Sequence, residues 1–395
     1  MQQALEGRPE LAQANAQTRA ARERVPQAEA WSEPMLQVGV QNDGFNRWSV
    51  GTTEMSWVSF MASQTFPFPG KQGLRGEVVR SDVRLSELTA ERVRLSTIAQ
   101  VRRGYLALQT IRARRVLLEK LIALDGRLVE LARIRLESGQ GAQSEVLSAQ
   151  VALSRVTQRR FQLEADERLE VQSLNRLRQR PLDTAIQTSD SPTALPSLLS
   201  ETQAQELAQK HSPELLAAQA GVTRAEASAS LARRSYFPDL TVSAGVMVRG
   251  RLDPMWTVQL GVPLPVFAGA RQARELAEAD ARKEASGYGV ETVEQLLALR
   301  AHQRLESMKA LSAIWQSYQQ GLLAQAEAAA ESTLAQYSAG RGSFVAVLDA
   351  NAVSISEVEA SLQVFADAWR LAIAQDELSV DEVASASSPT SSRGL

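Results

Sequence analysis

Two hydrophobic periods alternate along this chain, and the shorter one predicts β-strands. Leu36, Val38 and Val40 alternate with polar or small residues, which is the pattern of a strand with one apolar face. The same alternation returns from Leu240 to Val248. A second strand is expected to follow each alternating segment. We therefore expect two β-hairpins, with strands near residues 35–42, 56–66, 239–249 and 256–263.

The longer period predicts helices of unusual length. No proline interrupts residues 71–137 or 271–338, and leucines recur three or four positions apart between residues 117 and 131. Each segment is expected to form one unbroken helix of about 67 residues, which spans roughly 100 Å. Further helices are expected over residues 144–180 and 344–380, so that each long helix returns as a helical hairpin.

The two halves of the chain are copies of one unit. Pro9-Glu10-Leu11 recurs as Pro213-Glu214-Leu215, 204 positions later, and Ser138-Gly139-Gln140-Gly141 is matched by Ala339-Gly340-Arg341-Gly342. We therefore predict an internal tandem duplication in which each repeat holds a helix, a β-hairpin and a long helical hairpin. The first repeat is expected at 1–198, with its β-hairpin at 35–66, its helical hairpin at 71–180 and a linker at 181–198. The second repeat is expected at 199–384, with its β-hairpin at 239–263 and its helical hairpin at 271–380. A disordered tail is expected at 385–395.

The two repeats begin differently. The second has Glu201 to Gln209 ahead of its Pro-Glu-Leu, whereas the first has only Met1 to Gly7, without the basic and apolar regions of a signal peptide. We expect that a leading segment, including any signal peptide, is missing. No stretch approaches the roughly 18 apolar residues of a transmembrane helix, so strands must span any membrane that the protein enters.

Composition narrows the classes of function. The 395 residues include no Cys and only 2 His, which removes thiol catalysis and sites built from thiolate or imidazole ligands. The balance of 43 basic against 45 acidic residues selects neither nucleic acid nor an acidic surface. No Ser/His/Asp set or acid–base pair is recognisable. We therefore predict a protein that is not an enzyme, holds no metal or cofactor and binds no nucleic acid.

The Gly-x-Gly pairs lie between helices. A phosphate-binding loop would need a preceding strand and a following Gly-Lys-Ser/Thr, and neither pair has them. The pairs instead predict tight helix-to-helix turns in which glycine adopts a positive φ.

Four strands with one apolar face cannot close into a barrel. In lipid, an open sheet leaves edge N–H and C=O groups unpaired at several kcal/mol each, so we expect subunits to share a barrel of eight strands from two copies or twelve from three. The competing interpretation is a structural coiled-coil tether, periplasmic or cytoplasmic, whose long helical hairpins act as spacers. A tether does not account for two β-hairpins at matching points of both repeats.

The doubled Pro-Glu-Leu, the β-hairpins, their Pro-x-Pro exits and the run from Tyr337 to Asp349 resemble the TolC-like outer membrane efflux proteins. The resemblance covers about residues 4–380. It implies a mainly α fold with a β-barrel part: long antiparallel helical hairpins forming an α-barrel, and four strands per chain contributing to a trimeric, 12-stranded transmembrane β-barrel. The run from Phe66 to Lys71 is similar to the heavy-metal efflux branch.

The resemblance also implies a function and partners. The protein would be the outer-membrane channel-tunnel of a tripartite efflux pump, a passive export duct for small molecules or metal ions from the periplasm of a Gram-negative bacterium. Its partners would be two further copies in a homotrimer, a periplasmic adaptor (membrane fusion) protein, an inner-membrane pump of the RND type and outer-membrane lipid.

The resemblance places the periplasmic tip, its gate and the adaptor dock at the Gly-x-Gly turns. In the family, an Arg and two acidic residues after the Tyr form gate contacts. Here Gly342 stands at the Arg position and Ala346 at the first acidic position, with Arg341 one residue earlier, so the resemblance does not determine whether the gate is ionic. The candidate residues are Gly139, Gly141, Val146, Leu147, Tyr337, Gly340, Arg341, Gly342, Val347, Leu348 and Asp349.

Overall fold

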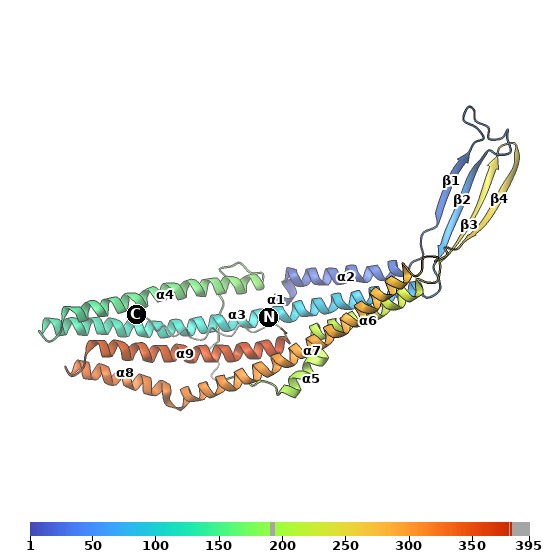
Figure 1. The fold of residues 1–395 in the computed structure, drawn as a ribbon. Helices are drawn as coiled ribbons and strands as arrows, with labels where there is room; N and C mark the ends of the chain where they lie inside the picture. The colour runs from blue at the N-terminus through green and yellow to red at the C-terminus, as the bar shows by residue number, and fades with distance from the viewer. Residues whose placement is uncertain (190–193, 379, 381–395) are drawn as a thin grey trace. The chain divides into compact units, whose positions relative to one another are not determined.

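A computed structural model describes residues 1–189, 194–378 and 380 of this protein, so the tail expected at 385–395 lies outside the described residues. The chain is mainly helical, with one four-stranded sheet (Figure 1). Its residues group into two compact units. One unit draws on residues 1–12, 91–213 and 294–395, and the other on 13–90 and 214–293. Each unit therefore combines segments of both sequence repeats.

The sheet belongs to the second unit, and its strands lie where alternation predicts them. They are β1 (Met35–Gln41), β2 (Trp57–Phe66), β3 (Leu240–Arg249) and β4 (Leu252–Gly261). The strand expected at 256–263 starts earlier, because Gly250, at φ +67°, allows a tight turn. Pro254 suggested a loop, but β4 is an edge strand, where a missing N–H is tolerated.

The sheet has one apolar and one polar face. The strands pair in the order β1-β2-β3-β4, all antiparallel, and one row across the sheet joins Val38, Phe60, Val246 and Trp256. Because paired residues share a face, alternation along each strand puts most apolar side chains on one face and most polar and small ones on the other, with Trp57, Met61, Met247 and Met255 as apolar members of the polar face. The apolar face is open to solvent in the single chain, with Val38 61% and Trp256 79% exposed.

Two helices of the first repeat precede the sheet, and two of the second repeat precede β3. These are α1 (Gln2–Gly7) and α2 (Pro9–Glu29) in the first repeat, and α5 (Glu201–His211) and α6 (Pro213–Arg234) in the second. Each repeat was expected to hold one helix ahead of its β-hairpin, and the structure has two there, divided at Arg8 in the first repeat and at Ser212 in the second.

The first helical hairpin follows its prediction closely. Helix α3 (Lys71–Glu137) runs for 67 residues without a break, and α4 (Gln143–Leu177) returns beside it. Two of its heptad leucines are buried, Leu121 at 8% and Leu128 at 1% exposed, and Leu117, Leu124 and Leu131 are half-buried. Burying each such side chain contributes about 1.5–3 kcal/mol, so packing between hairpins, rather than helix propensity, holds these helices.

The second hairpin corrects the prediction of an unbroken helix over 271–338. It consists of α7 (Gln272–Ser317), a π-helical segment η1 (Tyr318–Leu322), α8 (Leu323–Ser338) and the returning α9 (Phe344–Glu377). Gly321, inside η1, has φ +135° and ψ −5°, which is not a helical conformation. Glycine reaches this conformation because it has no Cβ, and the chain bends there in Figure 1. None of the described helices is both long and apolar enough to cross a membrane.

Candidate functional site at the helical turns

The first Gly-x-Gly turn ends α3 with a Schellman motif. Gly139 has φ +76°. The Gln140 N–H donates to the carbonyl of Arg135 at 2.8 Å, and the Gly139 N–H donates to that of Leu136 at 3.0 Å. These two bonds satisfy carbonyls that the helix leaves free at its end, and the left-handed residue between them reverses the chain.

The second turn repeats this geometry at the end of α8. Gly340 has φ +75°, the Arg341 N–H donates to the Gln336 carbonyl at 2.9 Å, and the Gly340 N–H donates to the Tyr337 carbonyl at 3.0 Å. Ser343 then caps α9, its hydroxyl accepting from the Ala346 N–H at 3.2 Å.

The second glycine of each pair serves a different purpose from the first. Neither Gly141 nor Gly342 has a positive φ. A Cβ on Gly141 would lie 3.1 Å from the Arg135 Cβ, and one on Gly342 would lie 3.1 Å from the Tyr337 backbone nitrogen. The expectation of a positive φ therefore holds for Gly139 and Gly340 only, and the other two permit close approach of the chain.

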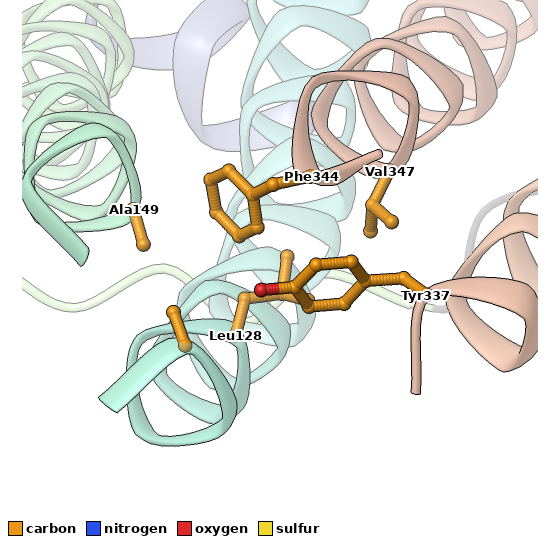
Figure 2. Close-up of a cluster of buried hydrophobic side chains, with 6 residues drawn as sticks. Leu128, Ala149, Tyr337, Phe344 and Val347 are labelled. Atoms are coloured by element: carbon orange, nitrogen blue, oxygen red, sulfur yellow. The ribbon is translucent and has the colours of Figure 1, made fainter. Parts of the chain in front are cut away.

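The two helical hairpins meet in one buried cluster behind these turns, shown in Figure 2. Tyr337 is its centre: the side chain is 0% exposed, and its ring meets that of Phe344 edge-on at 5.5 Å between centroids. The cluster takes residues from α3, α4, α8 and α9; its members are Leu128, Ala132, Ala149, Tyr337, Phe344 and Val347.

Polar contacts from the first hairpin surround Tyr337. Its hydroxyl donates to Glu145 Oε2 at 2.9 Å. The Arg135 guanidinium lies over the ring, 4.4 Å from its centroid, and also donates to the Tyr337 carbonyl. Burial, the hydrogen bond to Glu145 and the charge of Glu145 raise the pKa of Tyr337 to about 12. The hydroxyl is therefore a neutral donor near pH 7, and it joins the ends of two hairpins that belong to different repeats.

The other sequence-predicted residues fall into three environments. Val347 is buried in the cluster, and Val146 and Leu348 pack partly buried against it. Leu147 is exposed. Arg341 and Asp349 are also exposed, and within the described part of this chain they form no ion pair with each other. Their role as gate contacts stays a prediction.

Sequence reasoning missed Arg135, Glu145 and Phe344. The duplication held a signal for Glu145, because Glu145 stands four residues beyond Gly141 as Ala346 stands four beyond Gly342. The first repeat thus carries the carboxylate that the second lacks. Among the described residues, no group of three or more His, Cys, Asp or Glu side chains is placed to hold a metal ion.

Duplicated helical hairpins joined to a sheet with an exposed apolar face and two unpaired edges define a class of membrane channel protein. The chain belongs to the outer membrane efflux protein family, whose model matches residues 1–179 and 204–378. Family and fold are those of channel proteins.

Known proteins agree with this assignment. The nickel-cobalt-cadmium resistance protein NccC of Alcaligenes xylosoxydans xylosoxydans is 25% identical over 269 residues, which is 68% of this chain and 60% of that protein's length. The outer membrane protein VceC of Vibrio cholerae has the same fold, with a TM-score of 0.80 at 19% identity, covering 95% of this chain and 93% of that one. The open-state MtrE outer membrane channel of Neisseria gonorrhoeae gives a TM-score of 0.72 at 19% identity over 95% of this chain and 87% of that one.

Proposed function

We propose that this chain is one subunit of a homotrimeric outer-membrane channel, the export duct of a tripartite efflux pump in a Gram-negative bacterium. It carries out no catalysis. The chain belongs to the outer membrane efflux protein family, and the observation that supports the proposal most strongly is its sheet. One continuous apolar face of this sheet is open to solvent, and β1 and β4 each present an unpaired edge. In a membrane, lipid chains cover the apolar face. Pairing with the sheets of other copies gives hydrogen-bond partners to the N–H and C=O groups of the two edge strands.

Three copies give twelve strands with the apolar face toward lipid and the polar face toward the lumen. Gln37, Ser59, Thr241 and Gly245 lie on the polar face, and small or polar side chains leave room for a water-filled passage. The helical hairpins continue the duct into the periplasm. A coiled-coil tether would give the sheet no role.

The Gly-x-Gly turns are proposed as the periplasmic mouth, where the duct closes and where the adaptor docks. The contacts of Tyr337 with Glu145 and Arg135 support closure, because they hold the ends of both hairpins together in one subunit. Exposed Arg341, Leu147 and Asp349 are available to neighbouring subunits or to the adaptor. An inner-membrane pump of the RND type would supply the energy through the adaptor.

Metal ions are the favoured cargo. NccC, the relative described above, is named for resistance to nickel, cobalt and cadmium. The corresponding test is growth of a deletion strain in rising concentrations of each metal, with and without the gene for this chain. Equal growth with an intact duct would remove metal export from the proposal and leave other small molecules.

Mass measurement of the detergent-solubilised protein, together with conductance in planar bilayers, tests the channel itself. We expect the mass of three chains and discrete conductance steps. A stable monomer that forms no channels would overturn the shared barrel.

A further inference from the structure

A clamp inside the chain closes the exit of the first β-hairpin. Just after β2, the Phe68 ring stacks on Phe237 at 4.6 Å with an interplanar angle of 17°. Lys71 Nζ donates to Asp239 Oδ1 at 2.7 Å and to the Phe237 carbonyl at 2.6 Å, and the Phe68 N–H donates to the same Asp239 oxygen at 2.9 Å. Lys71 is buried and the Asp239 side chain is 29% exposed, so this ion pair is largely shielded from solvent.

The clamp follows from strand pairing. Because β2 and β3 are antiparallel, the end of β2 (Phe66) pairs with the start of β3 (Leu240). The segment that leaves β2 and the one that enters β3 are therefore side by side, and they meet through one apolar stack and one ion pair.

The exit of the second β-hairpin and the entry to the first carry similar residues, and in the described chain these stay largely open to solvent. After β4, Leu264 and Phe267 are 75% and 76% exposed, and exposed Arg271 directly precedes α7 as Lys71 begins α3. Before β1, Trp31 and Glu33 supply an aromatic ring and a carboxylate, the residue types that Phe237 and Asp239 supply before β3, although not at matching positions of the repeat. Trp31 meets Phe66 edge-on at 5.3 Å between centroids but remains 61% exposed, and Glu33 is exposed. Within the described residues, neither Arg271 nor Glu33 takes part in an ion pair.

We propose that the segment after β4 of one copy, residues 262–271, clamps onto the segment before β1 of the next copy, residues 31–35. The inference rests on the proposed trimer. Closing the barrel requires β4 of one chain to pair with β1 of another, and antiparallel pairing puts the end of β4 beside the start of β1. Leu264 and Phe267 then pack on the neighbour's Trp31, and Arg271 pairs with its Glu33. The intersubunit junction thus repeats the chemistry of the junction inside the chain.

The charged members favour a second copy over lipid as the occupant. Lipid would cover Leu264, Phe267 and Trp31, but it would leave a guanidinium and a carboxylate of opposite sign without partners at neighbouring positions. A second copy satisfies both groups and the apolar side chains together.

Cysteine cross-linking tests the proposal without background, because the chain contains no cysteine. We expect the double variant Trp31→Cys, Leu264→Cys to give covalent dimers and trimers on oxidation, reversed by reductant. Phe68→Cys with Phe237→Cys is the positive control and should link within one chain only. Arg251→Cys with Leu264→Cys is the negative control, because Arg251 lies in the turn at the opposite end of β4. Trimers by mass that fail to cross-link through residues 31 and 264 would overturn the clamp and leave the channel standing.

Charge exchange supplies a second, independent readout. Arg271→Glu and Glu33→Arg should each lower the temperature at which the detergent-solubilised trimer dissociates, and the double exchange should restore it. Equal dissociation temperatures for all four proteins would remove the ion pair from the clamp. A monomeric wild-type protein would overturn the clamp together with the proposed function.

Discussion

At the scale of single residues, Tyr337 joins the two repeats through one hydroxyl. Replacing it by Phe keeps the ring, its contact with Phe344 and the cation–π contact, and removes only the hydrogen bond to Glu145. A hydrogen bond to a charged group contributes about 1.5–3 kcal/mol. We therefore expect Tyr337→Phe to hold the mouth less firmly and to raise the conductance of single channels in planar bilayers.

Tyr318 provides a matched control for that experiment. Its side chain is also buried, and its hydroxyl forms a hydrogen bond with Glu357. Burial raises the pKa of Tyr318 above its usual range, and the charge of Glu357 and the hydrogen bond to it add to the increase. Tyr318→Phe removes the same kind of bond at η1 rather than at the turns. Raised conductance in both variants, or in neither, would contradict a gating role for Tyr337.

Asp125 gives a prediction about pH. It occupies a core position of α3 between Leu121 and Leu128, is 4% exposed, and burial raises its pKa from 3.8 to about 6. Below about pH 4 the carboxyl is protonated in both the folded and unfolded states. Between about pH 4 and 6 only the unfolded state ionises, so stability falls as pH rises, by about 3 kcal/mol in total, and the loss stays constant above that range.

The variant Asp125→Asn should remove this dependence. We expect its unfolding midpoint to exceed that of the wild type at pH 7 and to approach it near pH 4, as measured by circular dichroism of the solubilised protein. A wild-type profile for Asp125→Asn would show that this carboxyl does not titrate as its burial requires.

At the scale of elements, the two faces of the sheet predict opposite responses to one substitution. Val242 pairs with Leu260 on the apolar face, and its neighbour Thr241 lies on the polar face beside Thr65. Arginine facing lipid near the midplane costs about 2–4 kcal/mol, whereas arginine in a lumen stays hydrated. Val242→Arg should impair assembly in the outer membrane and Thr241→Arg should be tolerated, as judged by the amount of trimer in isolated membranes. Equal amounts would show that the two faces do not meet lipid and lumen, and the opposite order would show that the faces are assigned the wrong way round.

Periodicity predicted the elements well where one period runs without interruption. Helix α3 has the expected bounds because a glycine-containing turn ends it and proline-containing exits precede it. The break at η1 was missed because Gly321 is one of several glycines in helical sequence, and only backbone geometry separates a tolerated glycine from one at φ +135°. The early start of β4 was missed because Asp253 and Pro254 favour a loop, while the edge position of that strand comes from pairing.

At the scale of the whole molecule, the candidate site could be predicted only in part. The glycines were singled out because their spacing repeats in both halves, and Tyr337 because the run that begins with it resembles the family. Their partners were missed because they come from the other half: Arg135 lies 202 residues from Tyr337, and Glu145 lies 192 residues from it. Heptad spacing predicts that helices pair but not which residues of two distant hairpins meet at their ends.

The mouth of the assembled pump gives the last prediction. Gly139 and Gly340 have open space around the position of a Cβ, so a large side chain there would extend outward from the turn without disturbing the cluster behind it. Only the positive φ opposes it, at about 1–2 kcal/mol. We expect Gly139→Trp and Gly340→Trp to fold and form trimers but to abolish efflux, because the indole blocks the approach of the adaptor.

Gly139→Asn and Gly340→Asn are the controls, since asparagine tolerates the left-handed conformation and adds little bulk, and they should keep efflux. Trimer mass, adaptor cross-linking in native membranes and an efflux assay on the four variants separate the outcomes. Wild-type efflux from the tryptophan variants would remove the docking role and leave the turns as structure, and loss of efflux in the asparagine variants would attribute the effect to the backbone rather than to the adaptor.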